Sequence, residues 1–486
     1  MNDVEMAYQA TLEYLYTFVD YSLVRNFRNS PETFDLGRMR RLAEALGNPQ
    51  DQYPVIHVAG TKGKGSVAAL CASALRAAGY RVGLYTSPHL DDFAERIQFD
   101  GQPIPHAELV SLVDEQRLTF QSIPRLTFFE ITTALAFLYF ARQKATAGVI
   151  EVGLGGRLDA TNICRPRLAV ITSLSYDHMA LLGETLAEIA GEKAGIIKEG
   201  VPVVVAPQKE EARQVVERVA QERGSALIQV GRDYQFAALS HSLGGQLLQV
   251  WPASAMAMGT SAMGTSAMSI SAKSIELEIP LLGAHQVENA ATAYATLQVA
   301  SQQGMSITEE QIREGFRHTS WPGRFEVLRS DPPVVVDCAH NRDSAAKLCK
   351  AVDDYFPGMP VVLVFGASED KDILGMLEEL LPRVRQVILV KSYHPRAADP
   401  EKLALLVQQA GKPVRIIPEV TEALDEALRQ GGSEGGKSSP GGESSPGGES
   451  SPVLVLVTGS IFVAAGARIA WMKTMGTAAW VHQADR

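Results

Sequence analysis

Residues 55–66, VIHVAGTKGKGS, join an apolar, β-branched run to a glycine-rich turn, and a helical pattern follows directly. This order of strand, glycine loop and helix is typical of a segment that holds phosphate groups. Glycines let backbone N–H groups face an anion, and the N-terminus of the following helix adds positive potential. Lys64 supplies a full positive charge at the same place. The segment therefore predicts a nucleotide phosphate site at the end of a strand.

The loop departs from the usual phosphate-loop pattern, G-x-x-x-x-G-K-[ST], at two positions. Val58 stands where the first glycine belongs, Gly65 stands where the magnesium-holding hydroxyl belongs, and Ser66 comes one place late. The alternative is a glycine turn without a ligand, but the two lysines in the loop argue against it. The residues expected to bind the nucleotide phosphates are Gly60, Thr61, Lys62, Gly63, Lys64, Gly65 and Ser66.

Composition limits the class of protein. A chain of 486 residues is long enough for two or three domains. Its net charge of −10 argues against a general binder of nucleic acids or anionic membranes. The four cysteines have no C-x-x-C spacing and indicate reduced thiols, and no stretch resembles a signal peptide or a membrane span. We therefore expect a cytoplasmic monomer that binds neither nucleic acid nor membrane.

Short apolar runs alternate with helical patterns along most of the chain. The runs are continuously apolar, which favours strands buried on both faces of a mainly parallel sheet. They are VIHVAG, RVGLYTS, AGVIEVG, LAVITSL, VPVVVA, VVVDCA, VVLVFGA, QVILVKS and VLVLVTG. The pattern predicts an α/β fold. We expect a P-loop ATP-binding domain at residues 1–320 and a smaller Rossmann-like α/β domain at residues 321–486.

Two low-complexity segments interrupt this pattern. Residues 253–272 contain MGTSAMGTSAM between two strand-like pieces, LGGQLLQVW and SIELEIPL. Residues 431–452 contain the near-copies GGKSSP, GGESSP and GGESSP. Such compositions cannot bury a core, so we expect a hairpin tip or disordered loop in the first case and a flexible loop in the second. Neither segment is expected to take part in catalysis.

Polar residues follow several predicted strands, at the sheet edge where ligands of parallel sheets gather. Ser87 could replace the hydroxyl missing from the loop as a magnesium ligand, although it could also simply close a turn. Glu151 lies inside an apolar strand, where a carboxylate must be protonated, paired or bound to a cation. We favour Mg²⁺ over a buried pair with Arg157. After another strand, Asp177 and His178 offer a metal ligand or a structural histidine.

Lys193 lies in a helical segment of small and apolar residues, IAGEKAGIIK. A partly buried lysine has a lowered pKa and therefore some neutral amine. Neutral amine reacts with CO₂ to give a carbamate, which turns a cation into an anion that binds magnesium. The alternative is a surface ion pair between Glu192 and Lys193.

Taken in order, the motifs of this chain resemble those of the folylpolyglutamate synthases and dihydrofolate synthases. These enzymes belong to the Mur ligase superfamily of ATP-dependent amide-forming ligases. The motifs are VAGTKGKGS, TSPHL with ERI, TFFE, EVGLGGRLDATN, SYDHMALLG, EKAGIIK, HQVENA, WPGRFE and DCAHNRD. The resemblance runs from about residue 18 to about residue 466 and omits the two repeat segments.

The resemblance implies a set of ligand contacts. The ATP phosphates would be held by Thr61, Lys62, Gly63 and Lys64. Other parts of the nucleotide would be contacted by Asn289, Arg324 and Asp337, of which the last two come from the second domain. One Mg²⁺ would be bound by Ser87, Glu151 and His178, and a second would lie near a carbamate on Lys193. The pteroate would be contacted by Thr127, Phe128, Phe129, Glu130, Arg157 and Leu158. The catalytic residues would be Lys64, Lys193 and His340, the last near the phosphate or the glutamate.

The chain departs from the family pattern at three positions within these motifs. Cys338 and Arg342 stand in DCAHNRD where the family usually shows glycine and proline. Lys62 stands where asparagine is frequent, although lysine also occurs there in the family. The first two departures bear on the geometry of the turn that carries Asp337 and His340.

The implied activity is amide formation through an acyl phosphate, with ATP and L-glutamate as substrates and dihydropteroate, a reduced folate or both as acceptor. The motifs do not separate dihydrofolate synthase, folylpolyglutamate synthase and a bifunctional enzyme, and we expect the last. A cell-wall Mur ligase would carry a separate N-terminal UDP-binding domain, and only about fifty residues precede the loop. A non-catalytic nucleotide-dependent switch would be favoured by a loss of Lys64, Glu151 or Lys193, and all three are present.

Overall fold

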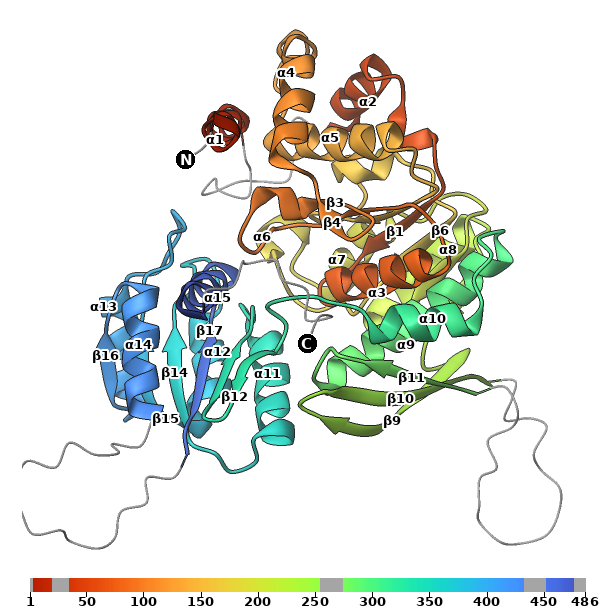
Figure 1. Ribbon diagram of the computed structural model, residues 1–486. Coiled ribbons are helices and arrows are strands. Elements are labelled where there is room, and N and C mark those ends of the chain that lie inside the picture. Colours follow the sequence, from red (N-terminus) through yellow and green to blue (C-terminus); the bar gives the residue numbers. More distant parts are fainter. Residues whose placement is uncertain (1–2, 20–34, 254–273, 432–451, 476–486) are drawn as a thin grey trace, which may run out of the picture. The chain divides into compact units, whose positions relative to one another are not determined.

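The computed structural model describes residues 3–19, 35–253, 274–431 and 452–475 (Figure 1). The two repeat segments of the sequence lie almost entirely outside these residues. The chain divides into two compact units. The first unit comprises Met1–Ser240, Gln246–Pro280 and His285–Thr319, and the second comprises His241–Gly245, Leu281–Ala284 and Ser320–Arg486.

The first unit is built on an eight-stranded sheet with the strand order β4-β3-β2-β5-β1-β6-β7-β8. Six of these strands run parallel, and β3 and β4 are antiparallel additions at one edge. The strands are β1 (Val55–Ala59), β2 (Val82–Tyr85), β3 (Ile97–Phe99), β4 (Gln102–Pro103), β5 (Ala147–Glu151), β6 (Leu168–Ile171), β7 (Val203–Val205) and β8 (Leu227–Gln229). The phosphate-loop strand β1 lies inside the sheet, between β5 and β6.

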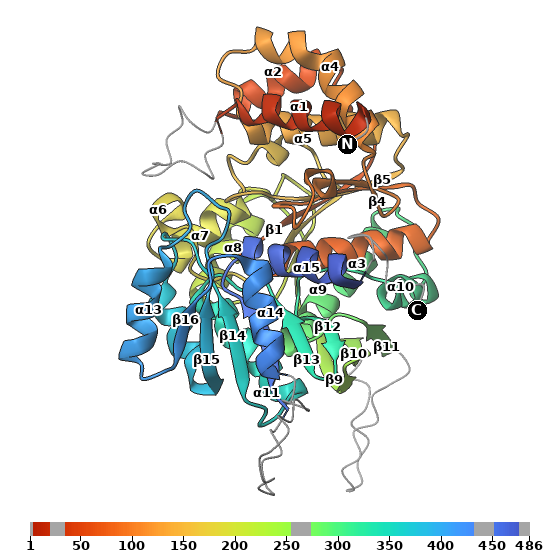
Figure 2. The ribbon, with the colours of Figure 1, turned by 60° about the vertical axis from the view of Figure 1, so that its left-hand side comes forward.

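Helices cover both faces of this sheet, which explains why its strands are apolar without alternation. In Figures 1 and 2, α2, α4 and α5 lie on one side of the sheet and α3, α9 and α10 lie on the other. The helices of the unit are α1 (Asp3–Tyr16), α2 (Leu36–Ala45), α3 (Lys64–Ala77), α4 (His106–Ser122), α5 (Phe128–Arg142), α6 (Met179–Leu182), α7 (Leu186–Ala194), α8 (Glu210–Glu222), α9 (Ala284–Gln302) and α10 (Glu309–Arg317).

A second, three-stranded antiparallel sheet belongs mostly to the first unit, and the sequence analysis did not predict it as a separate sheet. Its strands are β9 (Tyr234–Ser242), β10 (Gly245–Pro252) and β11 (Ile275–Ile279). The strand-like pieces on either side of residues 253–272 form β10 and β11, with Leu248 opposite Leu277. In β11 buried and exposed residues alternate, as in a sheet with one solvated face.

The second unit has a six-stranded sheet with the order β12-β13-β17-β14-β15-β16, in which only β12 is antiparallel to its neighbour. The strands are β12 (Glu326–Ser330), β13 (Pro333–Val336), β14 (Val361–Phe365), β15 (Val384–Leu389), β16 (Val414–Ile416) and β17 (Leu454–Thr458). The helices are α11 (Arg342–Tyr355), α12 (Ile373–Leu380), α13 (Pro400–Gln409), α14 (Val420–Gly431) and α15 (Ile461–Met475).

In most strands of the second unit, alternate residues enter two different cores. Leu363 packs with residues of α11, α12 and α13, whereas Val362 and Val364 pack with residues of α14 and α15. Figure 2 shows α14 and α15 on one face of this sheet. The predicted α/β fold is confirmed, and the nine predicted strands correspond to β1, β2, β5, β6, β7, β13, β14, β15 and β17.

None of the described helices is both long and apolar enough to span a bilayer. The four cysteines are buried free thiols.

His57 in β1 makes the stability of the first unit depend on pH. The side chain is fully buried, and its Nε2 lies 2.8 Å from Oγ1 of Thr161. Burial, with a smaller contribution from Lys198, lowers the pKa of His57 to about 3. Because the pKa in an unfolded chain is about 6.5, the unfolded state binds more protons between these values. The free energy of unfolding therefore decreases as the pH falls through this window.

We expect His57→Gln to remove this contribution, since glutamine does not titrate. Between pH 7 and pH 5, the wild-type protein should lose about 2 kcal/mol more of its free energy of unfolding than the variant does. Urea denaturation at several pH values measures the difference. Equal slopes for the two proteins would show that His57 is not a buried neutral side chain.

Candidate active site

The phosphate loop links β1 to α3 through two glycines with positive φ, Gly60 (152°) and Gly63 (85°). The N–H groups of Thr61 and Lys62 both donate to the carbonyl oxygen of Ser173, at 3.0 Å, which fixes the loop to the segment after β6. Gly63 is the N-cap residue of α3 and has no side chain that could cap the helix. The N–H groups of the first helical turn are therefore left for an anion.

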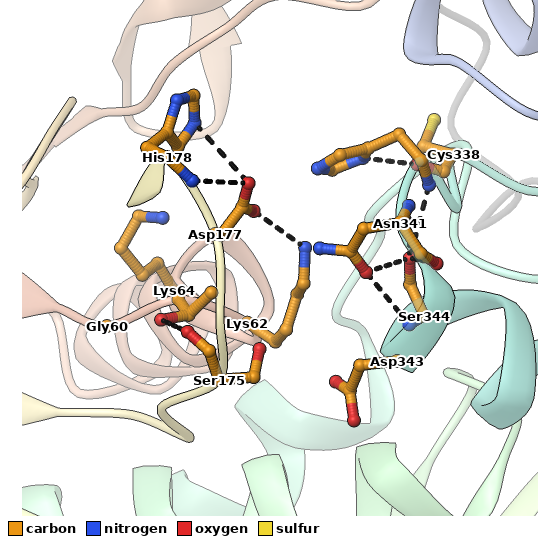
Figure 3. Close-up of polar contacts among 12 residues, drawn as sticks. Gly60, Lys62, Lys64, Ser175, Asp177, His178, Cys338, Asn341, Asp343 and Ser344 are labelled. Atoms are coloured by element: carbon orange, nitrogen blue, oxygen red, sulfur yellow. Dashed lines mark hydrogen bonds and ion pairs between the residues drawn. The ribbon is translucent and has the colours of Figure 1, made fainter. Parts of the chain in front are cut away.

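Both loop lysines pair with carboxylates from other segments of the first unit. Nζ of Lys62 lies 3.1 Å from Oδ2 of Asp177, as Figure 3 shows. Nζ of Lys64 lies 3.7 Å from Oε1 of Glu151. These pairs bring two ammonium groups to the phosphate loop. The sequence analysis gave Lys62 and Lys64 this place and noted Asp177, but it did not foresee the ion pair of Asp177.

Glu151 is the last residue of β5, beside Val58 in the neighbouring strand, and it is 5% exposed. Its Oε2 accepts a hydrogen bond of 3.4 Å from the N–H of Ser87. The structure thus brings together two of the three residues expected to bind one Mg²⁺. The alternative of a Glu151–Arg157 pair is wrong, because Arg157 pairs with Glu192 at 2.8 Å.

His178, the third expected ligand, is the N-cap residue of α6 and has a left-handed backbone (φ 50°). Its side chain is exposed, with Nε2 3.8 Å from Oδ1 of Asp177 (Figure 3). Within the described residues, no group of three or more His, Cys, Asp and Glu side chains could hold a metal ion. A magnesium ion here would need oxygen ligands from phosphate and water as well.

Lys193 lies in the last turn of α7 and is 5% exposed. Its Nζ donates a hydrogen bond of 2.9 Å to the carbonyl oxygen of Gly60 in the phosphate loop. Burial, followed by the charges of Lys64 and Lys62, lowers the pKa of Lys193 to about 7, although Asp177 acts in the opposite direction. The alternative of a surface pair between Glu192 and Lys193 is wrong.

Asn289, on α9, also lies against the phosphate loop. Its side chain is buried, and its Nδ2 donates to Oε1 of Gln286 at 2.9 Å. A Cβ atom at Gly63 would lie 2.2 Å from Oδ1 of Asn289. The positive φ and this close approach both require glycine at position 63. The predicted nucleotide contacts Gly63 and Asn289 are therefore neighbours.

The expected acceptor residues at the start of α5 also hold that helix in place. Thr127 and Glu130 form a capping box, in which Oγ1 of Thr127 accepts from the Glu130 N–H and Oε2 of Glu130 accepts from the Thr127 N–H. Oε1 of Glu130 also lies 3.1 Å from Nε of Arg38. Burial raises the pKa of Glu130, whereas its hydrogen bond from Thr127 and the charge of Arg38 lower it. The sequence analysis missed Arg38, which lies 92 residues away from its partner.

The two phenylalanines of this segment have different surroundings. Phe128 is buried against Phe93, with ring centroids 5.9 Å apart. The ring of Phe129 reaches the loop after β5, where a Cβ atom at Gly153 would lie 2.3 Å from it. This loop continues to Arg157, which is exposed, and Leu158, which is half-buried. Phe129 therefore lies against the start of the loop that continues to Arg157 and Leu158.

In the second unit, Asp337 follows β13 and holds the turn around it. Its Oδ2 accepts from the Phe325 N–H and its Oδ1 accepts from the Ala339 N–H, both at 2.8 Å. Burial raises the pKa of Asp337, while the hydrogen bond from Phe325 and the charge of Arg324 lower it. Arg324 donates to the carbonyl oxygen of Gly323, and Nδ1 of His340 lies 2.9 Å from the carbonyl oxygen of Cys338.

The departure at Arg342 lies at the start of α11, directly after this turn. Asn341 caps α11 by accepting a hydrogen bond from the Ser344 N–H, as Figure 3 shows. Arg342 is the first residue of the helix, a position at which proline is also favoured because no N–H donor is needed there. Its guanidinium lies 3.1 Å from carboxylate oxygens of Glu378 and Glu379 on α12. Arginine therefore keeps the helix start that proline would give.

Two family models match the chain. The Mur ligase middle domain matches residues 58–297, and the glutamate ligase domain of Mur ligases matches residues 323–436. Among known proteins, the chain is 37% identical over 370 residues to a dihydrofolate synthase/folylpolyglutamate synthase of Bacillus subtilis, covering 75% of this chain and 82% of that protein. It is 35% identical over 455 residues to a protein of the same description from Mycobacterium tuberculosis, covering 89% of each.

The chain also resembles solved structures of proteins with these descriptions. The chain matches Mycobacterium tuberculosis folylpolyglutamate synthase complexed with ADP and AMPPCP with a TM-score of 0.80 and 31% identity, covering 96% of this chain and 99% of that one. It also matches a complex of a folylpolyglutamate synthase with AMPPCP and folate, with a TM-score of 0.73 and 32% identity, covering 95% of this chain and 98% of that one.

Proposed function

The chain belongs to the folylpolyglutamate synthase and dihydrofolate synthase family of Mur ligases, and on that premise we propose that it is an ATP-dependent ligase that joins L-glutamate to the carboxylate of a pteroate or folate. The observation that carries the proposal is the cluster of amines at the phosphate loop. Lys62 and Lys64 lie on the loop, and the buried Lys193 donates to Gly60 beside them. The named relatives carry both activities in their descriptions, so we propose a bifunctional enzyme.

The chemistry requires the close approach of two anions. A carboxylate is a poor acyl donor, and transfer of the γ-phosphoryl group of ATP to it gives an acyl phosphate. The amine of L-glutamate then attacks the acyl carbon, and a tetrahedral intermediate expels phosphate. Lys62 and Lys64 would offset the repulsion between the anions and stabilise the charge that spreads over the phosphoryl oxygens. Asp177 and Glu151 hold the two ammonium groups at the loop.

The residues around Glu151 fit a magnesium ion. Magnesium prefers one or two carboxylates together with phosphate oxygens and water, and Glu151 is a buried carboxylate beside the backbone of Ser87. We propose that Ser87, Glu151 and His178 hold the ion. It would supply charge neutralisation at the phosphate oxygens.

We propose further that Lys193 carries a carbamate that approaches a second magnesium ion. Its pKa of about 7 leaves much of the amine neutral at neutral pH. The neutral amine adds to CO₂ with loss of one proton, and the product keeps one N–H group. That group can still donate to the carbonyl oxygen of Gly60, so the observed hydrogen bond is compatible with the modification.

The remaining assignments concern the substrates and the compartment. We propose that Phe129 and the Arg157–Leu158 loop contact the pterin-bearing acceptor. The nucleotide would be contacted by Asn289, Arg324 and Asp337. His340 would act near the phosphate or the glutamate. The four buried free thiols support a reducing compartment, which agrees with the cytoplasm.

The test of the proposed function is ADP release by the full chain in the presence of ATP, magnesium and L-glutamate. Dihydropteroate and tetrahydrofolate are supplied separately as acceptors, and a UDP-linked sugar peptide serves as the control for a cell-wall ligase. We expect glutamate-dependent turnover with both pterin acceptors and none with the control. Turnover with only one pterin acceptor would contradict bifunctionality, and turnover with neither would overturn the proposal.

We expect Glu151→Gln to raise the magnesium concentration needed for half-maximal activity and to lower the rate of acyl-phosphate formation by about 10²-fold. The substitution keeps the shape of the side chain and removes its charge. Magnesium titrations of the ligation rate measure the first effect, and single-turnover ADP release measures the second. If the variant loses stability but keeps its magnesium dependence, the carboxylate serves only as the ion partner of Lys64.

A further inference from the structure

The end of α7, which carries Lys193, is packed directly against the loop after β5. The N–H of Arg157 donates to the carbonyl oxygen of Glu192 at 2.8 Å. A Cβ atom at Gly156 would lie 2.8 Å from that same oxygen, and one at Gly195 would lie 2.4 Å from Cβ of Arg157. Only glycines allow the two backbones to come this close. The position of Lys193 therefore depends on how this loop is held.

One buried side chain, that of Asn162, connects the loop after β5 to the end of α7 by hydrogen bonds. Nδ2 of Asn162 donates to the carbonyl oxygen of Arg157 at 2.9 Å and to that of Gly195 at 3.1 Å. The amide thus ties the loop to the residue two places after Lys193. Asn162 itself lies in a short 3-10 helix, Ala160–Ile163, and is 5% exposed.

A lysine behind this asparagine fixes the direction of its amide. Nζ of Lys198 lies 2.6 Å from Oδ1 of Asn162 and 2.7 Å from its carbonyl oxygen. An ammonium group can only donate and carbonyl oxygens can only accept. Oδ1 must therefore face Lys198, and Nδ2 must face Arg157 and Gly195. The amide cannot turn over without breaking the three hydrogen bonds of its side chain.

We propose that Asn162, oriented by Lys198, is a positioning residue that holds Lys193 against the phosphate loop. Lys193 reaches Gly60 from the last turn of α7, and Asn162 fixes the end of that turn at Gly195. Neither Asn162 nor Lys198 contacts the phosphate loop in any described hydrogen bond, so both act through the α7 backbone. The inference rests on the proposed function, since it assigns Lys193 a part in the ligation.

The test compares Asn162→Ala with a control substitution that removes a capping hydrogen bond in the second unit. Asp399 is the exposed N-cap residue of α13 in the second unit, and its side chain accepts a hydrogen bond from the Glu401 N–H. Asp399→Ala removes this cap. We expect Asn162→Ala to lower kcat by about 10- to 100-fold while KM for ATP and for glutamate changes less than about twofold. Asp399→Ala should lower stability and keep kcat. Equal kcat in Asn162→Ala and wild type, or an equal loss in the control, would overturn the proposal.

A second pair of variants keeps the proposal testable if Asn162→Ala fails to fold. Lys198→Met removes the donor that orients the amide, and Lys198→Arg keeps two donors for the same two oxygens. We expect the methionine variant to lose kcat and the arginine variant to retain most of it. Amide hydrogen exchange of the 190–198 peptide should be faster in Lys198→Met than in Lys198→Arg. Equal rates and equal exchange in both variants would overturn the inference.

A failure of the proposed function can be distinguished by experiment from a failure of the positioning role of Asn162. If wild type shows no ligation, or if Lys193→Ala ligates at the wild-type rate, the role of Lys193 itself is wrong. If Lys193→Ala is inactive but Asn162→Ala keeps full kcat, only the positioning role of Asn162 is wrong. In the Lys193→Ala background, adding Asn162→Ala should cause no further loss in single-turnover rate, because the asparagine acts through that lysine.

Discussion

Replacing Lys64 by alanine is expected to lower the rate of glutamate ligation by at least about 10³-fold, equivalent to about 4 kcal/mol of transition-state stabilisation. Lys64 is the first residue of α3, and its ammonium lies at the helix N-terminus where a phosphate would bind. Its ammonium group lies 3.7 Å from Oε1 of Glu151, and the side chain is only partly buried. Its loss should therefore remove charge from the phosphate site while leaving the fold in place.

The controls separate a catalytic loss from a folding loss. Lys64→Met keeps most of the stem and should be as inactive as Lys64→Ala. Lys209→Ala removes an exposed lysine at the start of α8 and should keep full activity. Urea denaturation should show similar midpoints for all four proteins, and single-turnover ADP release measures the rates. Ligation near the wild-type rate in either Lys64 variant would refute the assignment.

The sequence was most informative about features that are local in the chain. The phosphate loop is such a feature, because strand, glycines, lysine and helix follow one another within residues 55–77. The continuously apolar runs predicted the buried strands for the same reason. By contrast, β9 has a largely exposed second half and β11 alternates between buried and exposed residues. The sequence analysis therefore named β10 and β11 only as strand-like pieces and missed β9, so the three-stranded sheet was not predicted as such.

The ion partners of the site could not be predicted from local pattern. Glu151 was correctly identified as a buried carboxylate, for which Mg²⁺ was favoured as partner and an ion pair with the nearby Arg157 was the alternative. In the structure parallel pairing of β1 and β5 places Glu151 beside the phosphate loop, and its cation is Lys64. Likewise the alternative considered for Lys193 was an ion pair with its chain neighbour Glu192, whereas its hydrogen-bond partner Gly60 lies 133 residues away. Both contacts depend on the order of the strands in the sheet, and this order cannot be read from any single segment of the sequence.

The roles of Thr127 and Glu130 show a different limit of prediction from the sequence. The resemblance implied that both would contact the acceptor, and the structure gives both a capping role at α5. A capping box has the local signature of a threonine followed three residues later by glutamate, and this signature is present in TFFE. The sequence thus contained the structural explanation, although the buried Arg38 that pairs with Glu130 could be found only from the fold.

Lys193→Ala and Lys193→Arg are both expected to reduce ligation by at least about 10²-fold, even though arginine keeps the positive charge. An arginine stays protonated and cannot form a carbamate. If Lys193 acts as a cation that donates to Gly60, arginine should replace it in large part, because guanidinium can donate to the same oxygen. Ligation rates at saturating ATP and glutamate measure the two variants. An active Lys193→Arg enzyme would end the carbamate hypothesis.

Because arginine is larger than lysine, an inactive Lys193→Arg enzyme needs a second measurement. Lys193→Ala leaves space at a buried site, and small molecules can be supplied to fill it. A short carboxylate such as acetate should restore part of the ligation rate if the missing group is an anion. Ethylammonium should restore it if the missing group is a cation. We expect rescue by the carboxylate alone, because burial and the charges of Lys64 and Lys62 disfavour the ammonium form of Lys193. The same two charges would attract an anion at this site.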